Sequence, residues 1–99
     1  MSLPKKIKIG GVDYNVITKE KVQDRGVALM GKTSYSTHEI SIDGTMPIAV
    51  QRLTLMHEVM HGVLHHIAEQ KLCEDERFVN ALANTWHQVL VDNPGIKWK

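Results

Sequence analysis

The segment that most constrains the fold is residues 46–69, where apolar residues recur at helical spacing. Seven of them form one broad stripe: Ala49, Leu53, Met56, Met60, Val63, Leu64 and Ile67. No proline follows Pro47 in this segment, and Thr45 stands before it as a candidate cap. The sequence therefore predicts an uninterrupted helix of about twenty residues, roughly 30 Å long, with its stripe packed against a sheet.

This helix contains the motif His-Glu-x-x-His at residues 57–61. Residues four apart lie on one helix face, so the imidazoles of His57 and His61 can bind one zinc ion. Glu58 is placed to take a proton from a metal-bound water. Four of the six histidines lie between His57 and His66, which disfavours a chance occurrence on a solvated helix face. The uncharged flanks of the motif match the pattern of zinc metalloproteases.

A second helix is predicted over residues 74–92, where Asn93-Pro94-Gly95 ends it. Its apolar stripe comprises Val79, Leu82, Ala83, Trp86, Val89 and Leu90. Only a short connection, residues 69–73, joins it to the first helix. Two helices joined in this way usually pack antiparallel. The start of the second helix is therefore expected beside the end of the first.

That arrangement offers a third metal ligand, which a catalytic zinc site requires. Glu76 borders the apolar stripe of the second helix and is the best candidate from its spacing. Glu74 and Asp75 are alternatives, because acidic residues also favour a helix N-terminus through the helix dipole. His65, one turn beyond His61, is a further alternative ligand.

The first part of the chain reads as short strands. Residues 6–9 and 12–17 alternate polar and apolar residues around Gly10-Gly11, which predicts a hairpin. Further strands are predicted over residues 27–30 and 35–43, a loop or short helix over 18–24, and a turn or frayed strand end over 31–34. The predicted fold class is α+β. The short sequential strands predict an antiparallel sheet, residues 5–43, that packs on the helix of residues 46–69, and a second antiparallel helix follows.

Composition limits the remaining possibilities. The 99 residues suffice for one domain, residues 1–99. The net charge is +1 and no apolar run approaches membrane-spanning length, so neither nucleic acid nor a membrane is expected as a partner. The single cysteine, Cys73, cannot form an internal disulfide, and residues 1–6 lack the apolar segment of a signal peptide. These features favour a cytoplasmic location.

The chain resembles the ImmA/IrrE family of zinc metallopeptidases, which includes small members encoded by bacteriophages and mobile elements. The resemblance covers nearly the whole chain and rests on residues 7–14, 40–43, 55–61 and 76–83. In this family the third metal ligand is a Glu followed by a small apolar residue and then a large apolar residue with Ala. Glu76, Val79, Leu82 and Ala83 match that order. The resemblance implies zinc bound by His57, His61 and Glu76, with Glu58 as the catalytic residue and a protein or peptide as substrate. It also implies a small antiparallel or mixed sheet packed on a zincin-like active-site helix. The chain departs from the family in lacking the helix-turn-helix segment often fused to it and in having a short sheet region.

The predicted reaction is metal-assisted hydrolysis of a peptide bond. An exposed sheet edge, expected near residues 37–42, would bind an extended peptide by strand addition. Tyr35 and His38 are candidate donors to the oxyanion. The alternative is a non-catalytic interaction module that keeps a structural zinc site, because a metal can stabilise a small domain. A DNA-binding regulator is a weaker alternative, since no recognition helix or concentrated basic face occurs.

Overall fold

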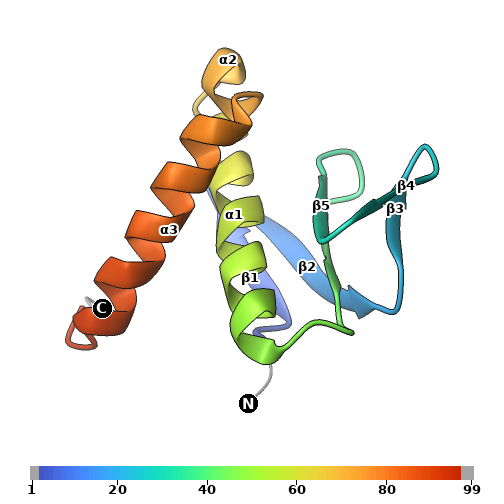
Figure 1. Ribbon diagram of the computed structural model, residues 1–99. Coiled ribbons are helices and arrows are strands. Elements are labelled where there is room, and N and C mark those ends of the chain that lie inside the picture. Colours follow the sequence, from blue (N-terminus) through green and yellow to red (C-terminus); the bar gives the residue numbers. More distant parts are fainter. Residues whose placement is uncertain (1–2, 97–99) are drawn as a thin grey trace.

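The computed structural model describes residues 3–96 and has the predicted α+β fold (Figure 1). Met1 and Ser2, part of the segment considered for a signal peptide, lie outside the described residues. The strands are β1 (Lys6–Ile9), β2 (Val12–Lys19), β3 (Val22–Asp24), β4 (Val27–Leu29), β5 (Gly31–Ser34) and β6 (Glu39–Asp43). The helices are α1 (Ile48–His66), α2 (Gln70–Cys73) and α3 (Glu76–Asp92).

Four strands form a mixed sheet in the order β1-β2-β6-β5. The β1–β2 and β5–β6 pairs are antiparallel, whereas β2 and β6 are parallel. The hairpin predicted around Gly10-Gly11 is confirmed, and both glycines have positive φ angles, 57° and 84°, as a tight two-residue turn requires. β3 and β4 pair separately as a small hairpin. Of the two sheet types predicted, the mixed one is therefore correct.

Three strand predictions were wrong in detail. Residues 18–24 are not a loop or helix, because they hold the end of β2 and all of β3. Residues 31–34 form strand β5, and residues 35–38 form a turn in which His38 has a φ of 54°. Strand β6 lies between β2 and β5, so the sheet edge predicted near residues 37–42 is an interior strand. The true edges are β1 and β5.

The two long helices agree closely with their predicted bounds. Thr45 does not cap α1, because its hydroxyl donates to Asp43 at 2.6 Å and the helix starts after Pro47. Asp75 caps α3 by accepting a hydrogen bond from the backbone N–H of Phe78 at 3.1 Å. Figure 1 shows that α1 and α3 run in opposite directions, joined by the short helix α2.

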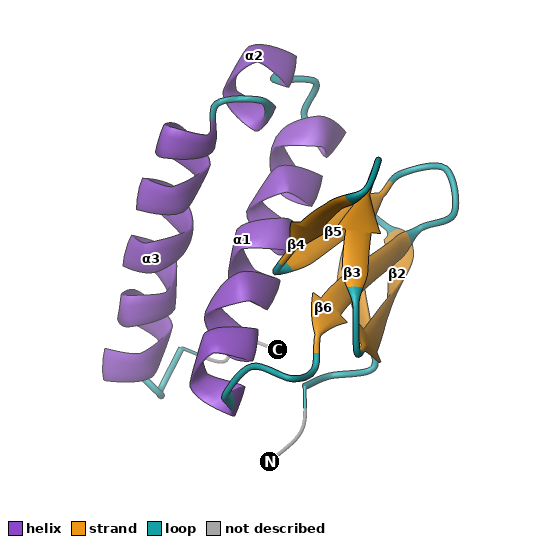
Figure 2. Ribbon diagram, turned by 45° about the vertical axis from the view of Figure 1, so that its right-hand side comes forward, coloured by secondary structure: helices purple, strands orange, loops and turns teal. Residues whose placement is uncertain are grey.

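Helix α1 lies between the sheet and α3 and contributes to two cores (Figure 2). The first core lies between the sheet and α1: Ile9, Tyr14, Ile40, Ile42 and Leu55. The second joins the three helices: Met60, Leu64, Cys73, Val79 and Ala83. Three residues of the predicted stripes are not buried. The exposed fractions of Leu53, Ile67 and Trp86 are 36%, 56% and 44%. α3 packs on one side only, so its buried face is narrower than its apolar stripe.

Candidate metal centre

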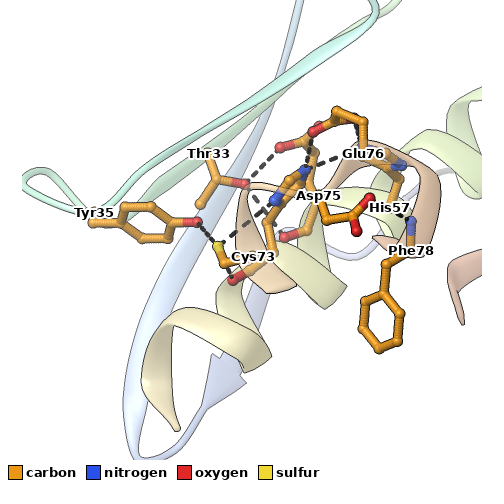
Figure 3. A network of polar contacts seen from close by, with 9 residues as sticks. Thr33, Tyr35, His57, Cys73, Asp75, Glu76 and Phe78 are labelled. Atoms are coloured by element: carbon orange, nitrogen blue, oxygen red, sulfur yellow. Dashed lines mark hydrogen bonds and ion pairs between the residues drawn. The ribbon is translucent and has the colours of Figure 1, made fainter. Parts of the chain in front are cut away.

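Three polar side chains from the two long helices converge on one point. His57 and His61 lie one turn apart on α1, and Glu76 is the first residue of α3. The Nε2 atoms of His57 and His61 lie 3.0 Å and 2.8 Å from the two carboxylate oxygens of Glu76 (Figure 3). The two Nε2 atoms are 3.1 Å apart. The antiparallel packing of α1 and α3 therefore produces a group that could hold a metal ion.

The chemistry of these donors suits a cation. Four ligands around zinc, at bond lengths of 2.0–2.1 Å, lie about 3.3 Å from one another in tetrahedral geometry. The contacts of 2.8–3.1 Å among the three side chains are near that value. Electron-rich nitrogen and oxygen atoms at this separation repel one another unless a proton or a cation lies between them. The imidazoles are half-buried, whereas the Glu76 side chain is 64% exposed, which leaves the site open on one side.

The alternative third ligands make other contacts. Glu74 accepts a hydrogen bond from Gln70 at 3.1 Å, and Asp75 caps α3. The ring of His65 is stacked on Tyr35, with centroids 3.8 Å apart and planes at 7°. Within residues 3–96, the structure brings only Glu76 to both histidines.

Glu58 is buried beside this group but does not belong to it. Its side chain faces β5, where the Thr33 hydroxyl donates to Oε1 at 2.8 Å (Figure 3). β5 can approach α1 closely at Gly31, where an added Cβ would lie 2.7 Å from Thr54 Cγ2 and 3.2 Å from Glu58 Cγ. The Oε2 atom accepts no hydrogen bond from the described residues and remains open to the cleft. Sequence reasoning missed Thr33, because its segment was predicted to be a turn.

Burial raises the pKa of Glu58 above its ordinary value. The Thr33 hydrogen bond and the nearby imidazoles of His61 and His57 oppose this rise, and Glu76 adds to it. A carboxylate with a raised pKa is a better proton acceptor near neutral pH than an exposed one.

Cys73 forms a second layer behind His61. Its Sγ lies 3.7 Å from the Nδ1 atom of His61 and donates to the backbone carbonyl of the same residue at 3.3 Å. The Tyr35 hydroxyl lies 3.4 Å from the same sulfur (Figure 3). Burial, together with Cys73, raises the pKa of Tyr35, so its hydroxyl stays protonated. The sequence carries no signal for this cluster, because its members are far apart along the chain.

The two candidate oxyanion donors differ in position. Tyr35 lines the cleft at the metal site, but its hydroxyl is directed at Cys73. His38 packs edge-on against Tyr14, with ring centroids 5.5 Å apart, and does not line the cleft. The structure therefore does not bring His38 to the site.

The three metal-ligand candidates and Glu58 open into a cleft of about 840 Å³. Helix α1 forms its floor with Val50, Leu53, Thr54 and the two histidines. Residues 28–33 form one wall, and Glu76, Asn80 and Asn84 of α3 form the other. This volume lies within the range of about 300–1,000 Å³ that is typical of ligand sites.

Comparison with known proteins gave no match to a family model, to a curated protein or to a solved structure. No helix among residues 3–96 has the length and apolar character needed to cross a membrane. The geometry of the site is therefore the structural basis for a proposal about function.

Proposed function

We propose that this protein is a zinc-dependent metalloendopeptidase, the activity of the ImmA/IrrE family that its sequence resembles. The observation that carries the proposal is the position of Glu58. It is a buried carboxylate beside a His57–His61–Glu76 group, it is not itself one of the three ligands, and it faces an open cleft. A purely structural metal site has no need of such a residue, whereas hydrolysis does.

The donor set supports zinc as the metal. Two imidazoles and one carboxylate, with an open fourth position, are the ligands of hydrolytic zinc sites, whereas structural zinc sites are usually closed by four protein ligands. When bound, zinc in such a site activates a water molecule and polarises the scissile carbonyl. The ion would be bound by the Nε2 atoms of His57 and His61 and by one carboxylate oxygen of Glu76.

Glu58 performs the proton transfers in this proposal. Thr33 holds one carboxylate oxygen and leaves Oε2 facing the cleft. Glu58 takes a proton from the attacking water and then delivers it to the leaving amine as the C–N bond breaks. Burial raises the Glu58 pKa above that of an exposed glutamate, which makes this carboxylate a stronger proton acceptor than an exposed one.

The free edge of β5 is the proposed binding place for the substrate backbone. β5 is an outer strand of the sheet, and Gly31 and Thr33 line the cleft. An extended peptide could add to this edge as a further strand and so place a carbonyl group near the metal ligands. This edge replaces the one predicted near residues 37–42.

The test compares zinc-loaded wild-type protein with the Glu58→Gln variant on a tryptic peptide library, with new N-termini identified by mass spectrometry. We expect cleavage by the wild type and a loss of at least about a hundredfold in the variant, since general-base catalysis contributes about 10²–10⁴-fold. The variant should retain its zinc, because Glu58 is not a ligand. Equal cleavage by both proteins would refute the mechanism. Zinc binding without any cleavage would favour the interaction module.

A further inference from the structure

Two asparagines on α3 form the cleft wall opposite β5. Asn80 and Asn84 follow Glu76 by one and two helical turns, and both line the cleft. Their side chains are exposed and make no hydrogen bond with another residue among 3–96. Asparagine is a poorer helix former than alanine, so neither residue serves the stability of α3.

The opposite wall presents free backbone groups. The Asp43 N–H donates to the Met30 carbonyl at 2.9 Å, and Lys32 and Ser34 stand opposite Ser41 and Glu39 in the same ladder. Hydrogen-bonded pairs alternate along an antiparallel ladder. The N–H and C=O groups of Gly31 and Thr33 therefore point away from β6, toward the cleft.

Strand β5 and helix α3 run alongside the same helix. Gly31 is adjacent to Thr54, Thr33 contacts Glu58, and Tyr35 reaches His65, so β5 follows α1 in the same direction. Helix α3 is antiparallel to α1 (Figure 2), so Asn80 and Asn84 lie progressively further toward the α1 N-terminus. Both line the cleft on the side opposite β5. The two walls thus run side by side with α1 as the floor.

The spacing of the two carboxamides fits an extended chain. Residues four apart on a helix are separated by about 6 Å along its axis, at 1.5 Å per residue. A strand exposes the backbone groups of every second residue on one edge, at intervals of about 6.6–6.8 Å. A carboxamide offers both a donor and an acceptor, which match the C=O and N–H of one peptide residue.

We propose that Asn80 and Asn84 bind one edge of an extended polypeptide whose other edge pairs with Gly31 and Thr33. This inference deepens the proposed peptidase function and rests on it. Side chains of the bound peptide that point to the floor meet Val50 and Leu53, so the ligand carries apolar residues at alternate positions. The metal site lies at one end of this track, beside Glu76.

The first test measures peptide binding and does not require catalysis. Zinc-loaded Glu58→Gln protein is screened against overlapping 12-residue peptides of β-casein, an unstructured protein, and the tightest binder is measured by fluorescence anisotropy. We expect this affinity to fall at least about thirtyfold when Asn80→Ala and Asn84→Ala are added, as for the loss of four hydrogen bonds, a donor and an acceptor at each carboxamide. Thr85→Ala with Gln88→Ala, on a part of α3 outside the cleft, is the matched control and should leave binding unchanged.

A second measurement separates hydrogen bonding to the peptide backbone from a general effect of the substitutions on the structure of α3. N-methylation of the peptide, one residue at a time, removes single N–H donors. With the asparagines present, affinity should fall at the positions that face β5 and at the alternate positions that face α3. In the double alanine variant only the positions facing β5 should remain sensitive.

The outcomes separate the two proposals. Unchanged affinity in the Asn80→Ala/Asn84→Ala variant, or no binding by any peptide of the set, would refute the proposal that these two asparagines bind the peptide backbone. If peptide binding depends on Asn80 and Asn84 but the wild-type protein cleaves no peptide, the binding proposal is supported and the peptidase proposal is refuted. Zinc content should be unaffected by the two substitutions, and thermal stability should be unchanged or slightly higher, because alanine favours helix more than asparagine does.

Discussion

At the residue scale, Glu58 links the chemistry of the site to its stability. Burial raises its pKa, so in the folded protein the protonated form is favoured above the ordinary pKa of a glutamate, about 4.3. At pH values between the ordinary pKa and the raised pKa of Glu58, the folded state holds more protons than the unfolded state. The free energy of unfolding therefore falls as pH rises through this window, and the full cost of the buried charge is present above it.

We expect metal-free Glu58→Gln protein to be more stable than metal-free wild type at pH 7.5, with the difference shrinking toward pH 4.5. The amide oxygen can still accept the Thr33 hydrogen bond, so the change removes mainly the buried charge. Urea unfolding in EDTA across this pH range measures the effect. Replacement of the exposed Glu20 by Gln is the control and should give no such trend. A wild-type-to-variant difference that does not change with pH would contradict the argument.

A second prediction concerns Cys73. Groups that hydrogen-bond to a metal-binding histidine commonly affect metal affinity by about 10–100-fold. Sulfur is a weak acceptor, so Cys73→Ala should lower zinc affinity by about tenfold, at the lower end of that range. Competition with a chromophoric chelator measures this affinity. Equal affinity in the two proteins would show that the contact of Sγ with His61 Nδ1 does not orient the ligand.

The residues of the site differ in how far they could be predicted. His57, Glu58 and His61 form a local motif. The antiparallel packing of two helices made Glu76 the best of several candidate ligands, and the family resemblance favoured it further. Thr33 and Cys73 contact the site from positions 25 and 12 residues away from their partners. No periodicity links residues at such separations, so only the folded chain could reveal them.

At the scale of elements, the contact between β5 and α1 depends on one glycine. Gly31→Ala would place a Cβ 2.7 Å from Thr54 Cγ2, a buried branched side chain that cannot rotate away freely. We expect a loss of about 1–3 kcal/mol in the free energy of unfolding, as for other overpacked sites. Gly95→Ala is the control, because nothing lies within 4 Å of the added atom. Chemical denaturation of the two variants measures this, and equal stabilities would contradict the close contact.

The helices were easier to predict than the strands for a physical reason. α1 and α3 extend over 19 and 17 residues, so their apolar periodicity repeats several times. β3 has three residues and β5 has four, and neither carries the alternation of polar and apolar residues by which β1 was predicted. The parallel pairing of β2 with β6 joins segments separated by β3 to β5, and no local signal encodes it.

At the scale of the whole molecule, the candidate metal site links α1 to α3. His57 and His61 belong to α1, which packs on the sheet, whereas Glu76 begins α3, whose buried residues are few. A ligand that binds only the folded state at 100 times its Kd stabilises that state by about 2.7 kcal/mol. Zinc at this excess should therefore raise the Tm by roughly 10–20 °C for a domain of this size.

The same measurement identifies the third ligand. Glu76→Ala should lose most of the zinc-dependent rise in Tm, because the remaining two histidines bind the ion weakly. Glu74→Ala should keep this rise in Tm, because Glu74 is hydrogen-bonded to Gln70, although it lies only two residues from Glu76. Scanning calorimetry with zinc and with EDTA gives both values. An equal loss in the two variants would place the third ligand elsewhere.

In the proposed peptidase, the position of β5 also limits which proteins serve as substrates. Its free edge is only four residues long and forms one wall of the cleft, across from α3, instead of an open face. A short edge inside a cleft is protected against the edge-to-edge association that long exposed strands promote. A single flexible chain can enter. Target proteins would then be cut only in loops, tails or transiently unfolded regions, and the rate of cleavage of a stable protein would follow its local opening.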